Sequence, residues 1–184
     1  LISAGEALPP DLLRRWTEKT GAEILDGIGT TEILHIFLSN RPGEVKPGAS
    51  GRTVPGYDAK IVDDDGKICD DGDIGHIALR VGDVQPLGLF DGYYEGENNL
   101  NRDSFQHGWY YTGDICLLHD NGDVDLIGRT DDVIRSGGEN IHPGDIEAIL
   151  AVHPGVKEVA VIGTPDNKWG EVVTACVAGE NLLA

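Results

Sequence analysis

The stretch Arg129–Leu150, "RTDDVIRSGGENIHPGDIEAIL", changes its character in the middle. Its first half carries charges and the glycine pair Gly137–Gly138. Its second half has the pattern of a helix that begins near Pro143, since proline is well tolerated in a first helical turn. A simple connector needs neither charged side chains such as Arg129 and Asp131 nor two adjacent glycines. The stretch therefore predicts a junction with a task beyond joining two elements.

The chain on either side of this stretch differs in its secondary-structure pattern. After it, apolar runs between residues 156 and 177 predict strands that form a small α+β unit with the helix. Before it, residues 51–128 predict hairpins, one of which turns at Asp120–Gly122. Residues 88–108 lack a periodic pattern, so we expect a loop there.

The first 40 residues alternate helical and strand patterns. Apolar positions near the N-terminus have helical spacing up to Gly21, a common helix stop. We expect a short strand at 22–25, a glycine-rich turn at 26–32 and an apolar element at 33–38. Proline and glycine become frequent between residues 41 and 56, which predicts a subdomain boundary.

The composition narrows the classes of partner. The 14 basic and 32 acidic residues give a net charge of -18, which repels nucleic acid and anionic membrane surfaces. A small anionic ligand is still compatible, because backbone N–H groups, one arginine or a metal ion can hold it. Three cysteines without a metal-ligand spacing favour the reducing cytoplasm. No apolar run approaches the roughly 18 residues that span a bilayer.

Two short stretches carry residues suited to a nucleotide. In "DGIGTTE", 26–32, glycines permit close backbone approach, the threonine hydroxyls suit phosphate oxygens, and Glu32 suits magnesium. A glycine turn followed by a threonine helix cap is an equal alternative. In "GWYYTGDI", 108–115, Asp114 suits two vicinal ribose hydroxyls, although an ordinary aromatic strand explains the same letters. Arg129 follows Asp114 by fifteen residues across a hairpin, which places either a shared site or a rim salt bridge at one sheet end.

Six blocks in order resemble the adenylate-forming superfamily, which includes acyl- and aryl-CoA synthetases, firefly luciferases and peptide-synthetase adenylation domains. The blocks are "SAGEALP", "DGIGTTE", "GDIGHIALR", "GWYYTGD", "GRTDDVIRSGGENIHPGDIEAIL" and "TPDNKWGE". Among these enzymes, "SAGEALP", "DGIGTTEILHIFLSNRPGEV" and "SGGENIHP" look most like bacterial benzoate- and halobenzoate-CoA ligases.

The resemblance implies the C-terminal part of a two-domain adenylate-forming enzyme. The expected fold class is α/β plus a β-barrel plus a small α+β domain. Residues 1–40 would end the α/β subdomain of the large domain, and 41–128 would form its β-barrel subdomain. Residues 129–131 would be a hinge, and 132–184 a truncated C-terminal α+β domain.

The resemblance also implies a two-step reaction and assigns residues to it. A carboxylic acid reacts with ATP and Mg²⁺ to give an acyl-adenylate and pyrophosphate, and coenzyme A then takes the acyl group. The small domain would rotate about Asp131 between the steps. The adenine pocket would be lined by Gly5, Glu6 and Ala7, and further nucleotide contacts would come from Asp26, Gly27, Ile28 and Leu126. Thr31 would contact phosphate, Glu32 would bind magnesium, and the ribose would be held by Asp114 and Arg129. Gly138 would line the path of the pantetheine arm, and Trp169 would contact the CoA nucleotide or only pack the core of the small domain.

The chain departs from the family pattern in two ways. Ile28 stands where the family usually has a tyrosine, so aromatic stacking on adenine from that position is absent. The Ser/Thr/Gly-rich phosphate loop and the catalytic lysine of the family match nothing in these 184 residues. We therefore expect the chain by itself to lack adenylation activity.

Other interpretations of the chain remain open at this point. In one, the full-length protein that contains this chain is an adenylation domain that loads a carrier protein. In the other, the chain is a non-catalytic interaction module. Ile28 and the apolar run 33–36 favour an aromatic or alicyclic acid. A homodimer is compatible with the resemblance.

Overall fold

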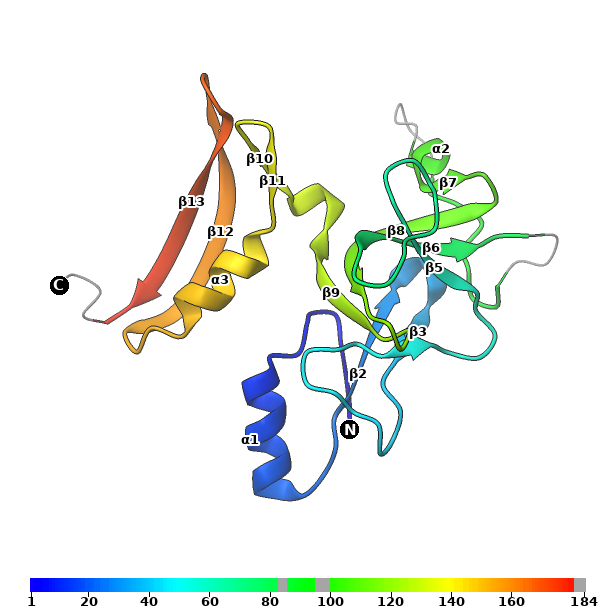
Figure 1. Cartoon of the computed structure of the whole chain (residues 1–184), viewed down its shortest axis with the longest axis horizontal. Coiled ribbons are helices and arrows are strands. Elements are labelled where there is room, and N and C mark those ends of the chain that lie inside the picture. The colour runs from blue at the N-terminus through cyan, green and yellow to red at the C-terminus, as the bar shows by residue number, and fades with distance from the viewer. Residues whose placement is uncertain (83–85, 95–99, 181–184) are drawn as a thin grey trace. The chain divides into compact units, whose positions relative to one another are not determined.

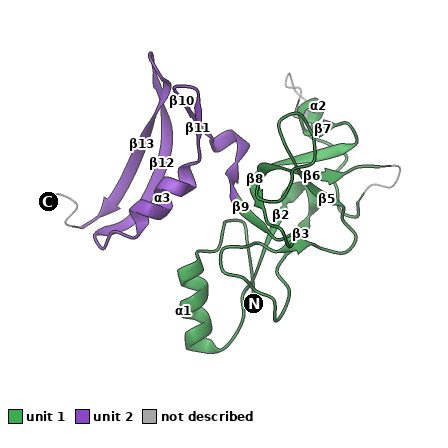
Figure 2. Cartoon of the chain, viewed as in Figure 1, with its two compact units in different colours: residues 1–126 green, residues 127–184 purple. Residues whose placement is uncertain are grey.

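The structure is a computed structural model that describes residues 1–82, 86–94 and 100–180. The chain divides into two compact units, Leu1–Leu126 (unit 1) and Ile127–Ala184 (unit 2), as Figure 2 shows. Among the described residues, every helix is too short or too polar to cross a membrane.

The elements follow one another along the chain as Figure 1 shows. Unit 1 contains β1 (Ile2–Ala4), α1 (Pro10–Thr20), β2 (Leu25–Thr30), the 3-10 helix η1 (Thr31–Ile33), β3 (His35–Ser39), β4 (Arg52–Thr53), β5 (Ala59–Val62), β6 (Ile74–Arg80), α2 (Leu100–Ser104), β7 (Phe105–Gln106) and β8 (Trp109–Leu118). Strand β9 (Val124–Arg129) leads into unit 2, which contains η2 (Thr130–Asp132), β10 (Ile134–Ser136), β11 (Glu139–Ile141), α3 (Pro143–Ala151), β12 (Val156–Asp166) and β13 (Gly170–Gly179).

Helix α1 ends at the glycine that the sequence predicted as its stop. Pro10 occupies its first turn, Asp11 forms ion pairs with Arg14 and Arg15, and Gly21 ends it with φ +69°. The Gly21 N–H donates to the Thr17 carbonyl oxygen at 2.8 Å. A left-handed residue of this kind satisfies a carbonyl group that the helix end would otherwise leave without a donor.

The first sheet of unit 1 has the order β1-β2-β3-β4, and its second strand corrects two predictions. The strand expected at 22–25 begins only at Leu25, and the stretch 26–32 is not a turn but strand β2 followed by η1. The glycines misled the prediction because they serve strand packing here. A Cβ at Gly27 would lie 2.6 Å from the Leu38 carbonyl oxygen, and one at Gly29 would lie 2.5 Å from that of His35.

The second sheet of unit 1 contains the predicted hairpins. Its path is β5-β6-β8-β7, and β9 pairs with β8. The loop expected at 88–108 is wrong for its end, where α2 and β7 form, and residues 95–99 lie outside the described residues. The two sheets share one core, whose fully buried members include Ile33, Phe37, Ile77 and Leu79.

Unit 2 is a four-stranded sheet of order β11-β10-β13-β12 with helix α3 packed on β12. The Glu147 carboxylate accepts a hydrogen bond from the Val161 N–H at 2.7 Å and so links the helix to the sheet. Strand β11 was not predicted. It pairs with β10 through a two-residue turn at Gly137–Gly138, where φ is +62° and +92°. A type I′ turn needs positive φ at both positions, which explains the glycine pair structurally.

Candidate functional site

Glu32 lies on η1, directly after strand β2, and a distant loop fixes it by two contacts. The Phe90 N–H donates to the Glu32 carbonyl oxygen at 2.8 Å, and the Tyr93 hydroxyl donates to Glu32 Oε1 at 2.8 Å. The loop comes this close because Gly88 has no side chain: a Cβ there would lie 2.5 Å from the Ile33 carbonyl oxygen. The structure thus places the predicted metal ligand against a loop to which the sequence assigned no function.

An aromatic cluster lies beside the Glu32 carboxylate. The Tyr110 hydroxyl is 3.5 Å from that of Tyr93, and the Tyr110 side chain is buried. Phe90 meets both rings edge-on, with centroid distances of 4.8 Å to Tyr93 and 5.7 Å to Tyr110. Burial raises the pKa of the Tyr110 phenol, and the hydrogen bond with Tyr93 and the negative charge of Glu32 raise it further. Tyr110 therefore stays protonated and adds no second negative charge beside Glu32.

The backbone of η1 is strained on the C-terminal side of Glu32. Thr31, the expected phosphate contact, opens η1 and is exposed. Leu34 closes it with φ +64°, a conformation that L side chains rarely adopt, and its N–H donates to the Thr31 carbonyl oxygen at 3.1 Å. Such strain persists where the surroundings over-determine the backbone, as they do at functional sites.

The Glu32 carboxylate suits a magnesium ion that arrives with a nucleotide. Within the described ranges, no three His, Cys, Asp or Glu side chains gather into a metal-binding group. Magnesium is usually held by one or two carboxylates together with substrate phosphates rather than by a cage of protein ligands. Because Tyr93 binds Oε1, Glu32 would offer Oε2 to such a cation.

The three residues expected in the adenine pocket line one cavity. Gly5, Glu6 and Ala7 lie between β1 and α1 and border a cavity of about 440 Å³, together with Leu8 and Leu12. Small-molecule sites commonly have volumes of about 300–1,000 Å³. The cavity is therefore of a suitable size for part of a nucleotide.

The other expected nucleotide contacts of β2 have packing tasks in this structure. Asp26 is 6% exposed, and its carboxylate accepts a hydrogen bond from the Ser50 hydroxyl at 3.2 Å. Burial raises the pKa of the Asp26 carboxyl. Gly27 permits the close approach of β3, and Ile28 belongs to the core. A role of these three residues in binding a nucleotide stays a prediction.

The two expected ribose-binding residues, Asp114 and Arg129, belong to different units, and the other expected site residues near the unit boundary are Leu126 and Asp131. Asp114 lies on β8 of unit 1 and is buried, and its N–H donates to Thr112 Oγ1 at 3.2 Å. Leu126 of unit 1 packs against the core. Arg129 ends β9 and Asp131 lies in η2, both exposed and both in unit 2.

The glycine pair of unit 2 forms a hairpin tip beside Trp169. The Gly137 N–H donates to the Trp169 carbonyl oxygen at 2.8 Å, and a Cβ on Gly137 would lie 2.9 Å from Trp169 Cε3. Around Gly138, by contrast, the space within 4 Å of a Cβ is open. Trp169 is 48% exposed, and Lys168 Nζ lies 4.3 Å from the centroid of its ring. Trp169 thus packs on the hairpin tip rather than inside a buried core, and its contact with CoA stays a prediction.

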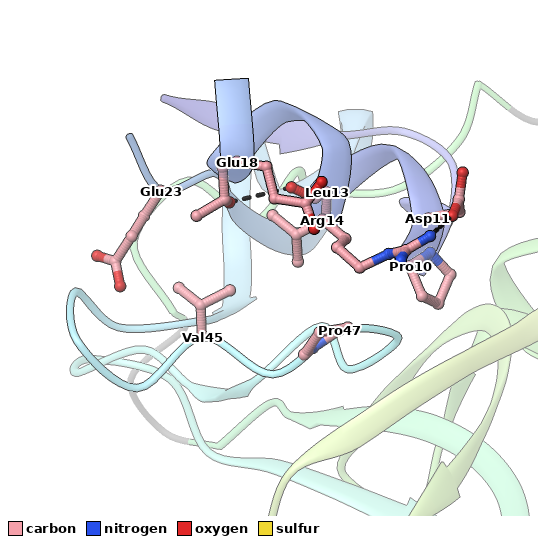
Figure 3. A pocket seen from close by; sticks show the side chains of 9 residues that line it. Pro10, Asp11, Leu13, Arg14, Glu18, Glu23, Val45 and Pro47 are labelled. Carbon is pink, nitrogen blue, oxygen red and sulfur yellow. Dashed lines mark hydrogen bonds and ion pairs between the residues drawn. The ribbon is translucent and has the colours of Figure 1, made fainter. Parts of the chain in front are cut away.

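A separate groove of about 610 Å³ lies along α1 (Figure 3). Leu13 and Arg14 line it from the helix, and Val45 and Pro47 line it from the facing loop. The predicted site residues do not line this groove.

The sequence profile of the AMP-binding enzyme family matches residues 1–94, and that of the AMP-binding enzyme C-terminal domain matches residues 145–182. The chain belongs to the AMP-binding enzyme family. It is 40% identical over 177 residues to the mitochondrial acyl-coenzyme A synthetase ACSM4 of Rattus norvegicus, a match that covers 96% of this chain and 30% of that protein. The chain therefore spans about a third of the length of such relatives.

Solved structures of related enzymes are similar to the whole chain. The anthranilate CoA ligase AuaEII in complex with anthranoyl-AMP is 40% identical, with a TM-score of 0.78, over 100% of this chain and 34% of that one. The benzoate CoA ligase of Burkholderia xenovorans LB400 is 36% identical, with a TM-score of 0.81, over 100% and 35%. The O-succinylbenzoate coenzyme A synthetase of Bacillus subtilis, in complex with ATP and magnesium ion, is 29% identical, with a TM-score of 0.83, over 100% and 37%. These likenesses confirm the expected fold class.

The residues that hold Glu32 in place were not predicted from the sequence. Tyr93 and Phe90 lie in a polar stretch without periodicity, and the aromatic letters themselves were the only available signal. The Tyr93 contact joins residues 61 positions apart, so no local pattern encodes it.

Proposed function

We propose that the full-length protein is an ATP-dependent ligase that activates a carboxylic acid as acyl-AMP and transfers the acyl group to coenzyme A. The observation that carries this proposal is the placement of Glu32. Its carboxylate is held from one side by Tyr93, next to the exposed hydroxyl-bearing residue Thr31. The family match on both sides of the unit boundary supports it.

In the first step, a carboxylate oxygen of the acid attacks the α-phosphorus of ATP, and pyrophosphate leaves with its electron pair. A bound magnesium ion supplies neutralisation of the phosphate charge. Glu32 would hold that ion and Thr31 would contact a phosphate oxygen. Asp114 would accept hydrogen bonds from the ribose hydroxyls, and Arg129 is the second residue that we propose for the ribose. Such positioning and charge neutralisation account for most catalysis in this class of displacement.

In the second step, the thiolate of coenzyme A attacks the acyl carbon and AMP leaves. We assign this step to the hairpin tip of unit 2, where the open space around Gly138 suits the passage of a narrow pantetheine arm. The half-exposed ring of Trp169 offers a stacking surface for the CoA nucleotide. Asp131 would be the hinge between the steps, which its exposure and its position in η2 support.

The acid is proposed to be aromatic or alicyclic, because solved relatives act on anthranilate and benzoate. The apolar residues Ile28 and 33–36, from which the sequence favoured such an acid, do not support this choice of acid, since Ile28 and Ile33 both lie in the core. We further propose a cytoplasmic protein, with a homodimer as a compatible state.

The test is a substrate screen with the full-length protein, ATP, magnesium, CoA and a panel of aryl, alicyclic and short-chain acids. AMP release that depends on both an acid and CoA is the expected result. Absence of AMP release with every acid would contradict the proposal. AMP release that requires a phosphopantetheinyl carrier domain in place of CoA would assign the protein to carrier loading.

A further inference from the structure

The Glu32 carboxylate has a specific hydrogen-bond partner, Tyr93, to which the proposed reaction assigns no role. The Tyr93 hydroxyl donates to Oε1 at 2.8 Å, and Tyr93 lies 61 positions further along the chain. A surface carboxylate near a nucleotide needs no such partner, because water satisfies its oxygens. Here the Tyr93 phenol, and not a water molecule, is the donor to Oε1.

Tyr93 is itself held on three sides. The Asn101 side chain bonds both backbone groups of Tyr93: Oδ1 accepts from the Tyr93 N–H at 2.6 Å, and Nδ2 donates to its carbonyl oxygen at 2.9 Å. The Phe90 ring meets the Tyr93 ring edge-on at 4.8 Å. Behind the phenol lies the Tyr110 hydroxyl at 3.5 Å. A side chain clamped in this way loses little further entropy when it orders its neighbour.

The backbone of Glu32 is fixed by the same loop, since the Phe90 N–H donates to its carbonyl oxygen at 2.8 Å. Glu32 is therefore held at two points, one on its main chain and one on its carboxylate. A carboxylate fixed through one oxygen presents the other in one direction. Hydrogen-bonding partners behind a metal ligand orient it and tune its affinity.

We propose that Tyr93 is a positioning residue for Glu32: its hydroxyl fixes Oε1 so that Oε2 is presented to the divalent cation that accompanies ATP. The inference rests on the proposed function, because it takes Glu32 as the ligand of that cation. It assigns to the loop 86–94 a task in the adenylation step. In this proposal Tyr93 acts through Glu32 and not by direct contact with the cation or the substrate.

The experiment compares two phenol-to-phenyl variants of the full-length protein, Tyr93→Phe and the matched control Tyr57→Phe. The Tyr57 hydroxyl donates to the Leu87 carbonyl oxygen at 3.2 Å, so the control removes a phenol that bonds the same loop without touching Glu32. The first readout is Mn²⁺ binding by electron paramagnetic resonance in the presence of a non-hydrolysable ATP analogue. The second is the magnesium concentration that gives half-maximal acyl-AMP formation.

For Tyr93→Phe we expect cation binding about 10-fold weaker, the lower end of the range for losing a hydrogen bond behind a metal ligand. The KM for the carboxylic acid should stay within about two-fold, because the proposal assigns Tyr93 to cation binding and not to the acid. Tyr57→Phe should change neither readout. Asn101→Ala, which frees the backbone of Tyr93, should weaken cation binding in the same direction by a smaller factor.

A double-mutant cycle with Glu32→Gln separates the inference from the proposed function. Tyr93→Phe should have no further effect on cation binding once Glu32 is replaced, because the two act as one unit. If Glu32→Gln weakens cation binding but Tyr93→Phe behaves like Tyr57→Phe, the positioning role is overturned while the proposed function stands. If Glu32→Gln leaves cation binding unchanged, the assigned role of Glu32 fails, and the inference fails with it. Thermal unfolding of each variant shows whether it has folded.

Discussion

The Glu32 site of unit 1 and the Gly137–Gly138 tip of unit 2 are fixed in opposite ways. Glu32 is held by Phe90 and Tyr93, which come from a loop far along the chain and pack on the buried Tyr110. The tip takes its shape from a two-residue turn, with one backbone hydrogen bond from Gly137 to Trp169, and Gly138 faces open space. A site built by long-range packing suits a step that needs exact charge placement. A site built by a local turn suits a step that needs clearance.

Within the hairpin tip, the largest effect is expected at Gly138. Gly138→Leu in the full-length protein should lower the rate of thioester formation about 10-fold or more. The added side chain would displace the pantetheine arm, and misplacement of a reacting group costs at least that factor in rate. Acyl-AMP formation should stay within about two-fold. The measurement is single-turnover conversion of acyl-AMP and CoA to acyl-CoA, followed by chemical quench.

The control for this variant is Gly138→Ala, which imposes the same strain at φ +92° but adds only one methyl group to open space. It should keep most of the thioester-forming rate. Equal losses in Gly138→Ala and Gly138→Leu would assign the defect to backbone strain and refute the claim of clearance.

The sequence predicted features that local chemistry decides. The end of α1 at Gly21, the turn at Asp120–Gly122 and the start of α3 at Pro143 follow from residues that have one favoured backbone conformation. It did not predict that glycines in 26–32 serve strand packing, because a glycine that permits close approach has the same letter as one that turns the chain. The Glu32–Tyr93 contact was equally hidden, since it depends on how the loop folds back over η1.

A second variant sharpens the contrast within the hairpin tip itself. Gly137→Ala places a Cβ 2.9 Å from Trp169 Cε3, whereas the same change at Gly138 meets open space. Both carry left-handed strain, so the difference isolates the clash. We expect Gly137→Ala to lower the free energy of unfolding by about 1–3 kcal/mol more than Gly138→Ala, the range typical of overpacking. Urea unfolding followed by tryptophan fluorescence measures it, and equal values would contradict the packing of Trp169 on Gly137.

The smallest expected effect is on the pH dependence of stability and concerns the buried Asp123, which forms long-range ion pairs within unit 1. Its carboxylate accepts hydrogen bonds from Lys46 at 2.7 Å, Arg52 at 2.9 Å and Asn121 at 2.7 Å. Burial acts to raise the pKa of Asp123, but the hydrogen bonds from Lys46 and Asn121 and the charges of Lys46 and Arg52 outweigh it and hold the pKa below its usual range.

A carboxyl group whose pKa is lower in the folded than in the unfolded state stabilises the fold at pH values above its unfolded-state pKa. This stabilisation is lost as the pH falls through the folded-state pKa. Asp123→Asn should therefore be less stable than the parent at neutral pH. The difference in unfolding free energy should shrink as the pH falls below about 4, the ordinary value for aspartate. A difference that stays constant from pH 7 to pH 3 would show that the charge of Asp123 does not matter.

The most direct test of the division between the two regions is a rapid-quench measurement of Glu32→Gln in the full-length protein, with each half-reaction followed separately. We expect acyl-AMP formation to fall about 100-fold, because the variant would hold the cation less well and removing one electrostatic stabiliser of the transition state costs on this scale. Conversion of supplied acyl-AMP and CoA to acyl-CoA should stay within about two-fold. An equal loss in both half-reactions would contradict the assignment of adenylation to unit 1 and of thioester formation to unit 2.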